Sequence, residues 1–185
     1  MLGLTGFDSN GVGAVLTYDS RDNQVSPSRG RMLELSNLAY RRSLGGDESF
    51  DTCSAKFRQF VPHGDGHVLA FRAQGRWTKD APPGGFSSID LRGYIRGEYI
   101  APNVATLEEK ERYRIAERWA LAGFIGSACL YDGVRDCDDT SNWYPNAGAG
   151  VIFTVKPSAR VVLRLDYAVG KADNSGLYLR FGHPF

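Results

Sequence analysis

The chain has 185 residues and a formal net charge of +1, with 22 lysine and arginine residues against 21 aspartate and glutamate residues. Mixed charge of this kind excludes the basic footprint of a nucleic-acid-binding protein, and the chain lacks the long apolar run that a transmembrane helix needs. Membrane-spanning strands need only about nine to eleven alternating residues, so a membrane protein built from strands is compatible with this composition. The length predicts a single domain over residues 1–185.

Alternation of apolar and polar residues with a period of two, which is typical of β-strands, recurs along the chain. In residues 31–42 it changes phase at Leu38 and Tyr40, which predicts a β-bulge. Helical periodicity is nearly absent, so the sequence predicts an all-β protein with eight or nine antiparallel strands. The expected strands are residues 11–19, 31–42, 51–61, 69–77, 110–117, 119–131, 147–156, 160–169 and 176–185.

The faces and connections of these strands favour a transmembrane β-barrel over a soluble sandwich. Charged residues flanked by Gly and Thr recur on the polar face, as in the wet interior of a barrel, whereas a sandwich needs an apolar core face. Short turns on one side and long loops on the other are also typical of outer-membrane barrels. A soluble lipocalin-like barrel is the alternative. The short connections are 62–66, 116–119 and 157–158, and the long ones are 78–107 and 130–146.

Six short segments, in order along nearly the whole chain, carry a family resemblance. They are LTYDSRDN (16–23), SPSRG (26–30), LRGY (91–94), GAGVIF (148–153), VVLRLDYAVG (161–170) and LYLRFGHPF (177–185). Together they resemble the barrel of BamA and TamA type outer-membrane assembly proteins, the bacterial surface antigen family, in its carboxy-terminal portion. The resemblance implies a barrel of the bacterial outer membrane that inserts or translocates proteins without covalent chemistry. It implies lipid, unfolded outer-membrane proteins and the barrel assembly machinery as partners.

The long loop after the fourth strand carries the motif Leu91-Arg92-Gly93-Tyr94. In the resembled family this loop folds back into the lumen and its Arg pairs with acids of the inner wall, which implies the same role for Arg92. A guanidinium in such a place needs charge-assisted partners, and Gly93 permits a sharp turn. The alternative is a solvated loop residue.

The partner of Arg92 stays open among three acids. Asp166 faces inward by its alternation, and Glu111 and Glu98 are the other candidates. The family often has an Asp on the strand after the loop, but Gly126 stands at that position here, so the partner must come from elsewhere.

The last strand alternates apolar residues at Leu177, Leu179, Phe181 and Phe185. This pattern resembles the signal by which outer-membrane barrels are recognised by the assembly machinery, through strand pairing at an open edge. The alternative is a strand that simply faces lipid.

Cys129 and Cys137 flank an Asp-rich loop, and their short separation in an oxidising compartment favours a disulfide. Cys53 is then left over as a small lipid-facing residue. No histidine or further cysteine lies near the pair, and the aspartates lack the spacing of a calcium loop, so no metal site is predicted. We find no nucleophile elbow or phosphate loop, and therefore expect neither an enzyme nor a cofactor.

Nine strands conflict with the even number usual in single-chain bacterial barrels. The chain is either the carboxy-terminal part of a larger barrel, without POTRA domains, or an eight-stranded barrel that associates with copies of itself. An eight-stranded lumen is filled by side chains, which would place the long loop at the mouth or at a subunit contact. Two further alternatives are a structural or oligomer-forming barrel without insertase activity, and the barrel of a longer protein that carries an enzyme domain.

Overall fold

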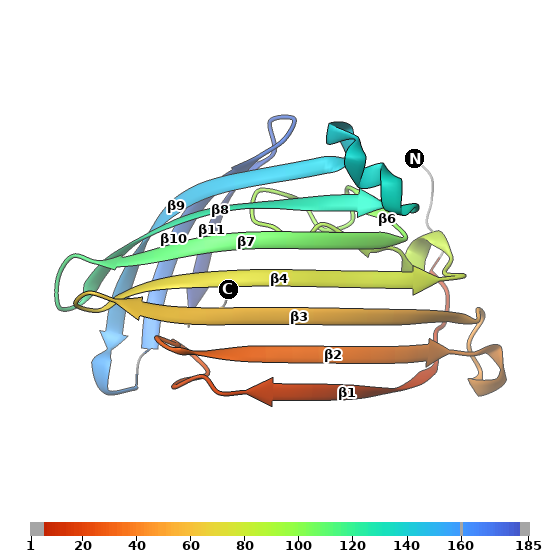
Figure 1. Ribbon diagram of the computed structural model, residues 1–185, viewed down its shortest axis with the longest axis horizontal. Coiled ribbons are helices and arrows are strands. Elements are labelled where there is room, and N and C mark those ends of the chain that lie inside the picture. The colour runs from red at the N-terminus through yellow and green to blue at the C-terminus, as the bar shows by residue number, and fades with distance from the viewer. Residues whose placement is uncertain (1–5, 160, 182–185) are drawn as a thin grey trace.

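The structure is a computed structural model that describes residues 6–159 and 161–181. Its main element is a curved antiparallel sheet of nine strands in the order β1-β2-β3-β4-β7-β8-β9-β10-β11 (Figure 1). These strands are β1 (Gly11–Asp19), β2 (Gly30–Tyr40), β3 (Phe50–His63), β4 (His67–Lys79), β7 (Asn103–Arg114), β8 (Trp119–Tyr131), β9 (Trp143–Lys156), β10 (Val161–Gly170) and β11 (Ser175–Phe181).

The remaining elements are short and lie in the connections. A two-stranded sheet joins β5 (Ser87–Ser88) to β6 (Ile100–Ala101) within the long loop. The 3-10 turns are η1 (Arg42–Leu44), η2 (Pro83–Gly85), η3 (Val134–Asp138), η4 (Thr140–Asn142) and η5 (Pro157–Ala159). Within the described ranges, no helix has the length and apolar character needed to cross a membrane.

The predicted all-β antiparallel fold is confirmed, with nine strands in the main sheet and a long loop after the fourth strand. The loop is shorter than expected, because β7 begins at Asn103 and not near residue 110. In the first half of β7 the inward positions mix apolar and charged side chains, which hides the alternation. Strands β1 and β11 form the two edges and do not pair with each other in the described residues, so the sheet is not closed there.

The two faces of the sheet have opposite character. Large apolar side chains such as Phe71, Leu107 and Ile125 are exposed on the convex face. Charged side chains, among them Lys110 and Arg164, are buried on the concave face. This apolar-out, polar-in alternation is the reverse of a soluble protein and is that of a membrane barrel wall.

The bulge predicted in β2 is wrong, because β2 pairs with β1 and β3 in an uninterrupted register. Leu38 and Tyr40 instead lie on the concave face, where the ring of Tyr40 stacks on that of Phe50 with 4.4 Å between the ring centroids. The apolar residues change face in the sequence because aromatic packing fills this part of the interior. The register break of the sheet lies in β10, between Val161 and Val162.

The turn between β1 and β2 folds back onto the concave face. Ser26 is buried there, and the Arg112 guanidinium on β7 donates to the hydroxyls of Ser26 and Ser28, each at 3.1 Å. The motif SPSRG therefore attaches the amino-terminal hairpin to the middle of the sheet.

Candidate functional site in the concave face

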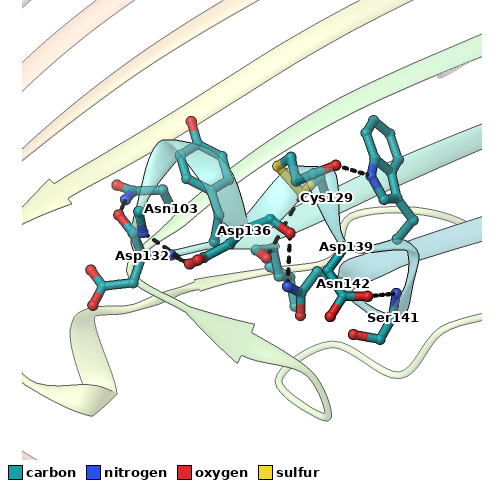
Figure 2. Close-up of a disulfide and its surroundings, with 12 residues drawn as sticks. Asn103, Cys129, Asp132, Asp136, Asp139, Ser141 and Asn142 are labelled. Atoms are coloured by element: carbon teal, nitrogen blue, oxygen red, sulfur yellow. Dashed lines mark hydrogen bonds between the residues drawn. A yellow bond between two sulfur atoms is a disulfide. The ribbon is translucent and has the colours of Figure 1, made fainter.

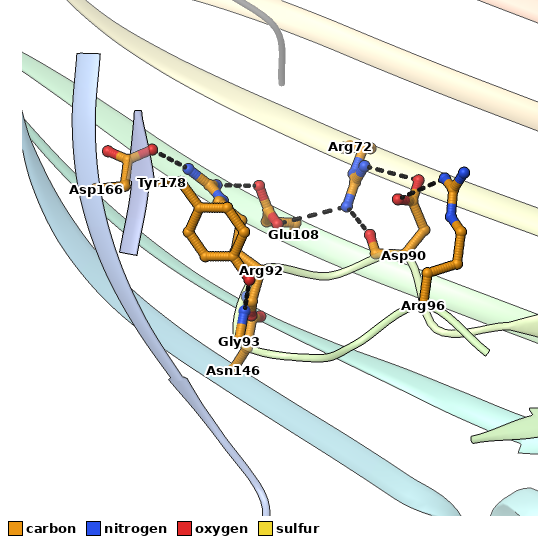
Figure 3. Close-up of polar contacts among 9 residues, drawn as sticks. All are labelled: Arg72, Asp90, Arg92, Gly93, Arg96, Glu108, Asn146, Asp166 and Tyr178. Atoms are coloured by element: carbon orange, nitrogen blue, oxygen red, sulfur yellow. Dashed lines mark hydrogen bonds and ion pairs between the residues drawn. The ribbon is translucent and has the colours of Figure 1, made fainter. Parts of the chain in front are cut away.

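Arg92 lies at the centre of the concave face, where the long loop crosses it (Figure 3). Its guanidinium contacts Glu108 Oε1 of β7 at 2.5 Å through Nη2 and Asp166 Oδ2 of β10 at 3.1 Å through Nη1. The side chains of Arg92, Glu108 and Asp166 are 4%, 1% and 0% exposed. One loop residue therefore bridges two strands that are separated in the sheet by β8 and β9.

Two further arginines share the same carboxylates. Arg164 Nε lies 2.6 Å from Asp166 Oδ1, and Arg72 Nη2 lies 3.4 Å from Glu108 Oε2. Arg72 also donates to the backbone carbonyl of Asp90, at 2.7 Å. Buried charges are stabilised by pairing and hydrogen bonds, and acids alternate with guanidiniums along the row of side chains in Figure 3.

The backbone of the loop tip is fixed from two sides. The Gly93 N–H donates to the Tyr178 hydroxyl of β11 at 2.8 Å, and Asn146 Nδ2 of β9 donates to the Arg92 carbonyl at 3.0 Å (Figure 3). Gly93 has a φ of 96°, and a Cβ there would lie 3.1 Å from the carbonyl carbon of Val169. Both the left-handed conformation and the close approach require glycine.

Leu91 and Tyr94 flank this tip with apolar packing. Both are buried in a cluster with Ile89 from the loop and with residues of β7 and β8. The Tyr94 hydroxyl donates to the Pro145 carbonyl at 2.5 Å and accepts the Lys171 N–H at 2.8 Å. All four residues of the motif thus hold the loop against the wall.

Of the three acids predicted as partners of Arg92, the structure brings only Asp166 to it. Glu111 lies on the convex face, 2.9 Å from His63 Nε2, and Glu98 lies in a turn of the loop, where its N–H donates to the Ile95 carbonyl. Those two assignments are corrected, since outward alternation in β7 carries Glu111 away from the interior.

The sequence does not predict Glu108 as a partner, because this residue falls between the expected loop, 78–107, and the expected strand, 110–117. Val104, Thr106, Glu108 and Lys110 are all buried on the inward face, but their mixed polarity gives no clear alternation in the sequence. Gly126 of β8 lies directly opposite Glu108 in the register. The carboxylate that the resembled family often has at this strand therefore comes here from the neighbouring strand.

The terminal strand places Leu177, Leu179 and Phe181 on the convex face of the edge strand β11, where all three are exposed. Phe185, the fourth residue of the predicted signal, lies outside the described residues. One edge strand of the sheet therefore carries a row of exposed apolar side chains on its convex face.

A disulfide joins Cys129 at the end of β8 to Cys137 in η3 (Figure 2). The Asp136 carboxylate accepts the N–H groups of Asp132 and Gly133, both at 2.9 Å, and these bonds lower its pKa. The loop is held by its own backbone bonds as well as by the disulfide. Cys53 is free and exposed.

Asp139 plays a similar part in the same loop. Its carboxylate accepts the Ser141 N–H at 2.8 Å, which lowers the pKa of Asp139. Asp136 and Asp139 therefore act as caps of backbone turns in this loop. Among the described residues we find no group of three or more His, Cys, Asp or Glu side chains arranged to hold a metal ion.

The apolar convex face, the charged concave face and the inward loop define the wall of a membrane β-barrel. Residues 5–94, from before β1 through Tyr94 of the loop motif, match the family model of the Omp85 superfamily domain. This part of the chain is therefore similar to an Omp85 superfamily domain, in agreement with the resemblance to BamA and TamA type barrels. No curated protein matched the chain.

Proposed function

We propose that this chain is part of an outer-membrane barrel that inserts or translocates proteins, and that it does so without covalent chemistry. The Omp85 superfamily domain and the exposed apolar residues of the convex face support this function. Lipid of the outer membrane is then one partner, unfolded outer-membrane proteins are the clients, and the barrel assembly machinery is the factor that folds the chain itself.

The observation that carries the proposal is the edge at β1, which is unpaired in the part of the chain that the structure describes. There β1 pairs only with β2, all nine of its residues are exposed, and it lies within the Omp85 match. Unpaired N–H and C=O groups along an edge strand are a template for an added strand. A client strand would pair there, with its alternate side chains directed to lipid and to the interior.

The Arg92 network supports this mechanism from the other half of the sheet. It links the loop to β7 and β10, and the bond from Gly93 reaches β11. We infer that the carboxy-terminal half keeps its curvature while strands are exchanged at the amino-terminal edge. Arg92 is a positioning residue in this account.

The test is to place the folded chain in liposomes and to time the folding of a urea-unfolded porin beside empty liposomes. We expect faster folding with the wild-type chain, and loss of the acceleration in Arg92→Ala. Arg96→Ala is the matched control, because Arg96 lies in the same loop but its side chain is 82% exposed. A folded wild-type chain that gives no acceleration would contradict the insertase role. It would favour a structural barrel, or one that forms homo-oligomers through its open edges.

A further inference from the structure

A cavity of about 230 Å³ lies between the long loop and the concave wall, next to Arg92. Five guanidinium groups line it against two carboxylates. Asp166 does not line the cavity but pairs with Arg92. When it is counted with the two lining acids, the arginines still outnumber the acids by two. The charged lining residues are Arg58, Arg72, Arg92, Arg96, Arg180, Asp90 and Glu108.

Arg58 and Arg180 carry this excess. Arg58 of β3 lies directly opposite Arg72 in the register, and Arg180 of β11 lies directly opposite Arg164. Like charges at directly opposed positions destabilise a sheet. Arg72 and Arg164 have carboxylates beside them, whereas neither Arg58 nor Arg180 forms an ion pair with any residue that the structure describes.

Two groups of the wall favour an anion as the ligand of this cavity. Arg58 Nε is buried and has no hydrogen-bond partner among the described residues. The Tyr178 hydroxyl, which also lines the cavity, accepts the Gly93 N–H and so keeps its own proton for a further acceptor. The cavity is therefore lined by hydrogen-bond donors from arginine guanidiniums and from the Tyr178 hydroxyl.

The geometry points to a binding site for a phosphate group, either inorganic phosphate or the phosphate monoester of a lipid headgroup. The cavity is smaller than the usual ligand pocket, which excludes a folded or extended client segment. A phosphate carries about 1.5 to 2 negative charges at pH 7 and several acceptor oxygens, and guanidinium groups bind such oxygens with charge-assisted, often bidentate bonds. The bound phosphate would neutralise Arg58 and Arg180 and join β3 to β11 across the interior.

The site is independent of the insertase role, and binding alone tests it. The chain, purified in a phosphate-free non-ionic detergent, is titrated with inorganic phosphate in a calorimeter. We expect saturable binding that Arg58→Gln and Arg180→Gln together weaken by about tenfold or more. Arg118→Gln is the control for each single variant, because it removes one positive charge from an exposed turn. If the double variant fails to fold, each single variant and the charge-preserving Arg180→Lys are compared instead.

Two results would overturn the site: no phosphate binding by the folded wild-type chain, or equal affinity in the wild type and the arginine-to-glutamine variants. The two sources of the phosphate are separated by competition. Micelles that contain phosphatidic acid would displace inorganic phosphate if a lipid headgroup is the natural occupant, and micelles of phosphatidylcholine would not. Retained binding of inorganic phosphate in both micelles would support the site with free phosphate as its ligand.

Discussion

Replacing Arg92 with alanine removes the guanidinium that joins Glu108 to Asp166. Loss of one partner from a buried ion pair typically costs about 3–5 kcal/mol, because the remaining charge is left without compensation. Here Asp166 keeps Arg164 at 2.6 Å and Glu108 keeps Arg72 at 3.4 Å. We therefore expect the lower end of this range, about 3 kcal/mol less free energy of unfolding.

Urea unfolding of the chain in detergent, followed by tryptophan fluorescence, measures this cost. With a denaturant slope of about 2 kcal/mol per molar, the midpoint should fall by about 1.5 M. Arg92→Lys keeps the charge but loses the fork that reaches both acids, so its midpoint should lie between those of the wild type and Arg92→Ala.

Arg96→Ala again serves as the control. Its guanidinium is 3.5 Å from Asp90 and mostly in solvent, so the midpoint should stay within the error of the wild type. The reasoning is refuted if Arg92→Ala and Arg96→Ala unfold at the same urea concentration, because Arg92 would then behave as a solvated loop residue.

Three further predictions concern the loops. Gly93→Ala should lower the free energy of unfolding by about 1–2 kcal/mol, measured in urea, because alanine is strained at a φ of 96°. Reduction of the disulfide between Cys129 and Cys137 should cost up to about 2.5 kcal/mol for a closed loop of this length, measured by thermal unfolding with and without reductant. Asp136 should titrate, in a ¹³C carboxyl experiment, below its ordinary pKa of 3.8, so its contribution to stability is complete above that value and is lost as the pH falls through the folded pKa.

Each of these has a contrary outcome, and the disulfide and Asp136 experiments each have a control. An unchanged urea midpoint in Gly93→Ala would show that the loop tip relaxes without cost. The disulfide experiment is repeated in Cys53→Ser, which removes the free thiol, and equal melting with and without reductant would contradict the stabilising role. For Asp136, the reference is the same carboxyl in the urea-unfolded chain, and equal midpoints in the two states would rule out the backbone bonds as a source of stability.

Most of the wall could be predicted from the sequence because strand alternation is a local signal. Residues 11–19 and 119–131 were placed at the observed bounds of β1 and β8. Strand alternation predicts the wall less well where the concave face carries apolar side chains. Tyr40 packs on Phe50 on that face, so the sequence pattern changes phase as it would at a bulge. Val104 shares the inward face with Glu108, so the first half of β7 shows no clear alternation.

The site was harder to predict because its contacts join distant strands. The alternation of β10 marks Asp166 as an inward acid. The choice between Asp166, Glu111 and Glu98 depends on where β7 begins, because its alternation directs Glu111 outward, and on the turn of the loop that holds Glu98. Glu108 is hard to predict for a second reason. The family resemblance places the acid at position 126, on the neighbouring strand β8, where this chain has glycine. Arg58 and Arg180 each lie directly opposite another arginine. This arrangement depends on the register between strands, which the alternation within one strand does not predict.

The central claim is that clients add their strands at the β1 edge, and photocrosslinking tests it most directly. A photoreactive amino acid at Leu16 of β1 is compared with the same group at Leu35 of β2, the residue directly opposite on the same face. With a urea-unfolded porin folding into liposomes that hold the chain, we predict a crosslink from position 16 to the porin and a much weaker one from position 35. Equal crosslinking at the two positions, or none during accelerated folding, would contradict strand addition at β1.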